Sequence, residues 1–168
     1  MSGRSDPKEL PRERLWAKVG IVPQKAFLFS GTVASNLRYG DEAASDDQLW
    51  RALETAQARD FVEAMPGGLE APIDQGGANV SGGQRQRLAI ARALVKRPEV
   101  YVFDDSFSAL DVATDARVRS ALRDETREAT VIVVAQRITT AMAADRIVVL
   151  DAGAVVGIGT HQELLGSC

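Results

Sequence analysis

Two continuous apolar runs on either side of a helical pattern constrain the fold of this chain more than any other feature. Residues 100–103 and 131–135 are β-branched or aromatic almost throughout, which is typical of strands covered on both faces in a parallel sheet. Between them, residues 114–127 carry apolar side chains at helical spacing. The order strand, helix, strand predicts an α/β fold.

Shorter apolar runs extend this prediction towards both ends of the chain. Residues 19–22 and 147–150 read as two further strands. A short turn separates the second of these from apolar residues 154–158, which predicts a hairpin. A short helix is expected to follow near residues 161–165.

The block from about residue 29 to residue 94 reads as mostly helical. Ser45 and Gln48 match a capping box, and apolar residues follow on one helical face. A Met-Pro-Gly-Gly sequence at residues 65–68 ends that helical region. The pattern therefore predicts a helical insert within an α/β core.

Composition and charge exclude several classes of function. The net charge of −3 and the aromatic content of 5% do not suit a surface that coats nucleic acid, so no nucleic-acid partner is expected. No apolar run approaches the length of a membrane span, and the first residues lack the apolar core of a signal peptide. Any link to a membrane is thus expected through a partner or through further chain. Cys168, the only cysteine, excludes an intramolecular disulfide and fits a reducing, cytosolic setting.

The segment 79–87 reads NVSGGQRQR and leads into an apolar helical pattern. A helix cap alone would explain Ser81 and Gln84, but it would not explain Gly82 and Gly83. Each glycine costs roughly 1 kcal/mol relative to alanine within a helix. Glycines are expected there if a ligand must approach the backbone closely, because a bare helix N-terminus is an anion site.

Polar residues follow two of the predicted strands. Asp104 and Asp105 come directly after residues 100–103, and Gln24 follows residues 19–22 after one proline. Taken alone, an acidic turn and a loop glutamine are the simpler explanations. The carboxyl ends of parallel strands are, however, where open α/β sheets bind ligands.

In this order and spacing, these segments resemble the nucleotide-binding domain of ATP-binding-cassette (ABC) ATPases. The segment 79–87 resembles the signature motif, with Val80 in place of the usual leucine. Residues 108–111, ending at Asp111, resemble the D-loop at the dimer interface. Asp104 resembles the Walker B aspartate, which holds Mg²⁺, usually through water. Gln24 resembles the Q-loop glutamine, which in the family reaches the metal and the attacking water.

The resemblance implies a P-loop-NTPase-type, mostly parallel sheet with a helical subdomain insert, incomplete at the N-terminus. The expected parts are a core strand and Q-loop (10–28), a helical subdomain with the signature motif (29–95), and a core with the Walker B, D-loop and switch regions (96–168). The implied cofactors are ATP and Mg²⁺, with Ser81, Gly82, Gly83, Gln84 and Asp111 contacting the nucleotide.

The form of residues 27–37 is typical of exporters. It implies that the partners are the transmembrane domains of an ABC exporter and a second nucleotide-binding domain, at the cytoplasmic face of the membrane. An ABC-type ATPase without a membrane partner, acting on DNA or ribosomes, is the alternative that this segment argues against.

Two departures from the family pattern bear on catalysis. Asp105 stands where the family has the glutamate that acts as general base, and Gln136 stands where the family has the switch histidine. The shorter Asp105 side chain withdraws the carboxylate, and glutamine has no titratable proton. Together they resemble the degenerate subunit of a heterodimeric exporter, whose intact signature motif serves the partner's site. His161, the only histidine, is not expected to be catalytic.

The sequence contains no Gly-Lys pair and hence no Gly-x-x-x-x-Gly-Lys-Ser/Thr loop. The resemblance starts near Leu10, so the chain is expected to be part of a longer protein and to bind ATP weakly by itself, because that loop is the main phosphate cradle. A non-catalytic remnant or regulatory binding module therefore stays open as an alternative.

Overall fold

A computed structural model describes residues 11–136 and 138–166. Leu10, where the family resemblance begins, and Cys168 lie outside the described residues. The chain divides into two compact units, Met1–Ile132 and Val133–Cys168.

Three strands form one sheet in the order β1-β4-β5, in which β1 and β4 lie in the first unit and β5 (Thr130–Val134) ends two residues into the second. The first unit begins with α1 (Arg12–Lys18), which runs directly into β1 (Val19–Val22). The strand β4 (Val100–Asp104) pairs parallel to β1, with Val22 opposite Phe103. Because the two strands are parallel and in register, the residues that follow both of them emerge at the same edge of the sheet.

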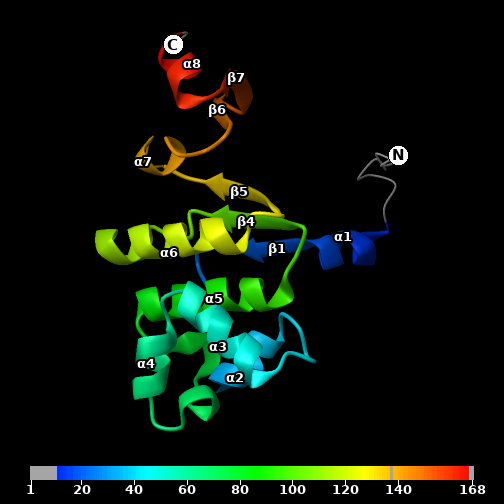
Figure 1. Ribbon diagram of the computed structural model, residues 1–168, viewed down its shortest axis with the longest axis vertical. Helices are drawn as coiled ribbons and strands as arrows, with labels where there is room; N and C mark the ends of the chain where they lie inside the picture. The colour runs from blue at the N-terminus through cyan, green and yellow to red at the C-terminus, as the bar shows by residue number, and fades with distance from the viewer. Residues whose placement is uncertain (1–10, 137, 167–168) are drawn as a thin grey trace. The chain divides into compact units, whose positions relative to one another are not determined.

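The predicted helical insert is present between β1 and β4 (Figure 1). Its elements are β2 (Gly31–Thr32), α2 (Val33–Arg38), α3 (Asp46–Thr55), α4 (Arg59–Ala64), the 3₁₀ turns η2 (Gly68–Glu70) and η3 (Gln75–Gly77), β3 (Pro72–Ile73) and α5 (Gly82–Lys96). The two short strands β2 and β3 pair antiparallel to each other.

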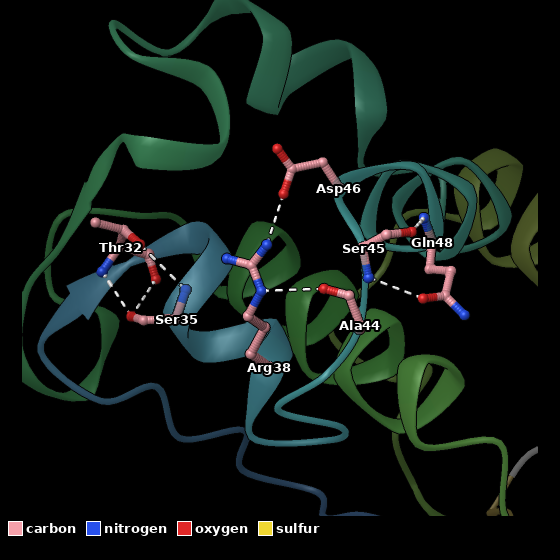
Figure 2. Close-up of polar contacts among 7 residues, drawn as sticks. All are labelled: Thr32, Ser35, Arg38, Ala44, Ser45, Asp46 and Gln48. Atoms are coloured by element: carbon pink, nitrogen blue, oxygen red, sulfur yellow. Dashed lines mark hydrogen bonds and ion pairs between the residues drawn. The ribbon is translucent and has the colours of Figure 1, made fainter.

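Local side-chain caps fix where these helices begin. The Ser45 hydroxyl accepts from the backbone N–H of Gln48 and the Gln48 side chain accepts from the N–H of Ser45, as the capping box predicts (Figure 2). Thr32 and Ser35 form the same arrangement at α2. Arg38 then joins the two helices, because its Nε donates to the carbonyl of Ala44 at 3.2 Å and its Nη2 to Asp46 at 2.6 Å.

The core of the first unit is centred on α5, which packs against α2 and α3 on one side and contacts β1 on the other. Its side chains Leu88 and Ile90 are fully buried, as are Leu37 and Leu49 of the insert. Hydrophobic burial on both sides thus holds α5 in place between the insert and the sheet.

The helix α6 (Val112–Glu125) and the strand β5 (Thr130–Val134) appear close to the predicted residues 114–127 and 131–135. All five residues of β5 are exposed, however. The prediction that this strand is covered on both faces is therefore wrong for the described residues, because none of their side chains buries it. The strand β4 buries Tyr101 and Phe103 on one face, whereas Val100 and Val102 on the other face are half-buried, so the prediction of two covered faces is confirmed for one face only.

The second unit contains α7 (Ile138–Ala141), β6 (Ile147–Asp151), β7 (Ala154–Gly159) and α8 (His161–Leu165). The strands β6 and β7 form the predicted antiparallel hairpin, with Asp151 opposite Ala154. Ala152 and Gly153 between them both have positive φ, 46° and 81°, which is the geometry of the two-residue turn that matches strand twist. Within the described part of the chain, none of the helices is long and apolar enough to cross a membrane.

Candidate functional site

The structure brings together the residues that follow β1 and β4. The Gln24 Nε2 group donates a hydrogen bond to Oδ2 of Asp105 at 3.1 Å, across 81 residues of sequence. Asp104 is the exposed last residue of β4. Three predicted site residues thus share one edge of the sheet, as the parallel pairing of β1 with β4 requires.

The turn after β4 holds Asp105 in a defined position. Asp105 has a φ of 44°, in the left-handed region. The hydroxyl of Ser108 donates to the Asp105 carbonyl at 2.8 Å, and the hydroxyl of Ser106, which is fully buried, donates to the carbonyl of Val22 at 2.6 Å. The Asp105 carboxylate therefore extends from a turn that is held by one hydrogen bond within the turn and by another to the end of β1.

The N-terminus of α5 combines a complete cap with an open backbone. The N–H of Gln84 donates to the Ser81 hydroxyl at 3.2 Å, and the N–H of Ser81 donates to the Gln84 side chain at 2.9 Å. A Cβ atom added at Gly82 would meet no described atom within 4 Å outside the adjacent residues and the backbone of α5 itself. Packing within the described chain therefore does not account for this glycine, whereas close approach of a ligand would.

Gly83 differs from Gly82 because an added Cβ would lie 3.3 Å from the carbonyl oxygen of Ala109. The segment 108–111 thus packs against the first turn of α5. Asp111, at the end of this segment, accepts a hydrogen bond from the N–H of Thr114 at 2.9 Å and caps α6. This hydrogen bond holds the pKa of Asp111 below its ordinary value. Asp111 therefore has a local structural role beside the predicted contact with nucleotide.

Gln136 is exposed and lies in the second unit, two residues after the end of β5. His161 is the first residue of α8. This helix is capped by Thr160, whose N–H donates to Oε2 of Glu163 at 2.7 Å, so the segment forms the capped terminal helix that the sequence predicts.

A shallow cavity lies between β1, α2 and α5, and Phe29, Tyr39 and Arg92 are among the residues that line it. The rings of Phe29 and Tyr39 lie 4.5 Å apart and are both exposed. Arg92 donates from Nη2 to the carbonyl of Phe27 at 3.1 Å, whereas its Nη1 is buried without a partner. Burial lowers the pKa of Arg92, so its charge sits in a poorly solvated position.

Sequence reasoning missed two buried polar residues at this site, Ser106 and Gln86. The Gln86 Nε2 group donates to the carbonyl of Pro23 at 3.2 Å, and only 2% of the residue is exposed. The signal that could have found Gln86 is its place on the apolar face of α5, where an amide needs a hydrogen-bond partner.

No cluster of three or more His, Cys, Asp or Glu side chains able to hold a metal occurs among residues 11–136 and 138–166. At the sheet edge, Asp104 and Gln24 instead offer a carboxylate oxygen and an amide oxygen. Mg²⁺ is usually held by one or two such protein oxygens together with substrate phosphates and water. These residues fit an ion that is shared with a bound nucleotide and do not form a closed metal cage.

Comparisons with known protein families and solved structures identify the family of this chain. The family model described as "ABC transporter" matches residues 3–108. An uncharacterized ABC transporter ATP-binding protein of Mycobacterium tuberculosis is 54% identical over 166 residues, which cover 97% of this chain and 28% of the relative. The ATP-dependent lipid A-core flippase of Chromobacterium violaceum is 43% identical over 94% of this chain and 27% of its own length.

Among solved structures, a bacterial Atm1-family ABC exporter with ATP bound superposes with a TM-score of 0.92 and 36% identity, over 96% of this chain and 28% of that one. The chain thus spans less than a third of the length of these relatives. The mixed α/β architecture with its parallel strands is that of the ABC ATPase fold, and the chain belongs to the ABC transporter family.

Proposed function

We propose that this chain is part of the ATP-binding subunit of an ABC exporter and works with ATP and Mg²⁺. The contact between Gln24 and Asp105 is the observation that carries the proposal. It joins the residue after β1 to the residue after β4, where an attacking water and a metal-bound phosphate would meet.

Each residue of the site then has a distinct task. Asp104 and Gln24 would hold Mg²⁺, which neutralises phosphate charge when bound. Asp105 would orient the attacking water, and Gln136 would donate a hydrogen bond to the terminal phosphate. The capped and open N-terminus of α5, with Ser81, Gly82, Gly83 and Gln84, would bind the phosphate of a nucleotide held mainly by a second domain. Asp111 would lie at the interface with that domain.

We propose further that the chain's own nucleotide site is degenerate and that the exporter is a heterodimer. The Asp105 side chain is one methylene shorter than glutamate, and misplacing a catalytic group by about 1 Å can cost on the order of 10²-fold in rate. The first turn of α5 retains its complete cap, so the site that it serves in the partner would stay competent.

The membrane domains of the exporter would contact the cavity between β1, α2 and α5. The exposed rings of Phe29 and Tyr39 offer an apolar contact there. Arg92 also lines the cavity and would place its guanidinium charge near a carboxylate of the incoming segment. Such a contact would place the chain at the cytoplasmic face of the membrane.

The test of the degenerate site is a double substitution in the full-length exporter, co-expressed with its partner. Asp105→Glu together with Gln136→His should raise ATP turnover. Glutamate regains the reach of the family's general base, and histidine regains a titratable proton. A matched control, Asp105→Asn with Gln136→Asn, should not raise it. Unchanged turnover in the restored variant would contradict the assignment of these two residues.

The absence of a Gly-Lys pair from the sequence favours a second proposal, that this chain alone is a weak ATP binder or a non-catalytic module. Isothermal titration of the 168-residue chain with Mg-ATP tests it. Low-micromolar affinity would refute it.

A further inference from the structure

Two consecutive carbonyl groups directly before Gln24 are held by buried side chains. The Ser106 hydroxyl donates to the carbonyl of Val22 at 2.6 Å, and Gln86 Nε2 donates to the carbonyl of Pro23 at 3.2 Å. The two donors come from different elements, since Ser106 belongs to the turn after β4 and Gln86 to α5. The end of β1 is therefore attached at once to the acidic turn and to the helix that opens at Gly82.

Packing alone does not account for an amide at Gln86. It is 2% exposed, and its neighbours on the same face of α5, Ala89 and Ile90, are buried and apolar. A buried amide without a hydrogen-bond partner costs about 1–3 kcal/mol, a cost that an apolar side chain of the same size would avoid. The hydrogen bond to Pro23 is the feature that an apolar residue could not supply.

The side chain of Gln24 depends on this arrangement, because Gln24 itself is exposed. A long exposed side chain is free to rotate unless its backbone is fixed at the correct distance from its partner. With the carbonyls of Val22 and Pro23 held, the Gln24 amide reaches Oδ2 of Asp105 at 3.1 Å.

We propose that Gln86 and Ser106 are positioning residues that fix Gln24 against Asp105. Gln86 thereby connects α5, which carries the signature motif, to Gln24 and Asp105 of its own chain. The inference rests on the proposed function for its catalytic consequence, but not for its geometric one. Neither residue is assigned a contact with nucleotide.

The geometric consequence is tested by NMR of the chain labelled with ¹⁵N-glutamine, without nucleotide. The Gln24 side-chain resonance is identified by its loss in Gln24→Ala. In the wild-type background, Asp105→Asn should shift this resonance because the two side chains touch. In a Gln86→Met or Ser106→Ala background the same change should leave it unshifted. A shift of wild-type size in both backgrounds would overturn the proposal.

A matched control separates positioning from stability. Thr126 is also buried, and its hydroxyl donates to the carbonyl of Leu122 at 2.7 Å, so Thr126→Val removes the same kind of bond as Ser106→Ala but far along the chain from Gln24. The two variants should lose similar thermal stability, and only Ser106→Ala should abolish the Asp105-dependent shift. An equal effect of both on the resonance would identify a general loss of order and would refute positioning.

The catalytic consequence is tested by ATP turnover of the assembled exporter carrying the Asp105→Glu and Gln136→His restoration. There Gln86→Met should lower kcat about tenfold and leave the KM for ATP unchanged, because Gln86 does not touch the nucleotide. It should cause no further loss once Gln24 is alanine. Additive loss in the Gln24→Ala background would overturn the proposal. If the assembly shows no ATP turnover at all, the proposed function fails and the NMR result alone decides the positioning role.

Discussion

Replacing Gly82 with alanine would separate what the start of α5 does for the fold from what it is proposed to do for a nucleotide. Gly82 is the first residue of α5, and outside its neighbours and the backbone of that helix an added methyl group would meet no described atom within 4 Å. Alanine is favoured over glycine by up to about 1 kcal/mol within a helix, and it also restricts the unfolded chain. In the less demanding first turn we expect a gain of about 0.5 kcal/mol, which would raise Tm by about 1–2 °C in a domain of this size.

The same methyl group should impair the assembled exporter. It would occupy the space through which a phosphate is proposed to reach the backbone N–H groups of the first turn, so turnover at the partner's site should fall on the order of 10²-fold. Thermal unfolding followed by circular dichroism measures the first effect, and the ATPase rate of the co-purified assembly measures the second. A variant that is both more stable and less active is the expected outcome.

Gly83→Ala is the matched comparison. Its methyl group would lie 3.3 Å from the carbonyl oxygen of Ala109 and 3.8 Å from Leu110, so the gain in helix propensity should be offset by the tight contact and stability should not rise.

If Gly82→Ala left turnover unchanged, no ligand would approach that backbone, and the reasoning would be refuted. If Gly82→Ala destabilised the chain, the space at that position would be filled in the folded protein, and the packing argument would fail.

Three further substitutions have defined outcomes. Ser81→Ala should lower the free energy of unfolding by about 1 kcal/mol in urea titrations, because the cap on α5 is lost, whereas Ser81→Thr should retain it. Asp111→Asn should be less stable than wild type at neutral pH only. The hydrogen bond from the N–H of Thr114 lowers the pKa of the Asp111 carboxyl group. The stabilisation by the carboxylate is therefore present above the unfolded pKa of about 3.9 and is lost as pH falls through the folded pKa. Equal differences in the free energy of unfolding at pH 7 and pH 3 would contradict this. Arg92→Met should keep the stability within about 1 kcal/mol, because it removes a buried unpaired donor together with one hydrogen bond, but transport by the full exporter should fall; unchanged transport would exclude Arg92 from the membrane-domain contact.

The elements that the sequence predicted well are those whose signal is local. The strands β1 and β4 match their apolar runs within a residue, and the hairpin turn at Ala152 and Gly153 lies between the two predicted strands. The start of α5 also follows from local chemistry, because Ser81 and Gln84 form the cap that their spacing predicts. Caps and turns depend on neighbours within a few residues, which a sequence displays directly.

The features that the sequence did not reveal depend on partners far along the chain. The pairing of Gly31 with Ile73 joins two strands of only two residues each, too short for any periodic pattern. The bonds from Gln86 to Pro23 and from Ser106 to Val22 span 63 and 84 residues. The exposure of β5 was mispredicted because an apolar run reports what a strand can bury and does not report which segment covers it.

The left-handed backbone of Asp105, at a φ of 44°, decides which replacements can be interpreted at this position. Aspartate and asparagine adopt that conformation more readily than other residues that carry a Cβ. Asparagine therefore changes the charge while the turn keeps its shape, whereas alanine adds a conformational cost of about 1 kcal/mol or more. Asp105→Asn therefore reports on the charge of the carboxylate, whereas a defect seen only with alanine reports on the changed backbone conformation of the turn.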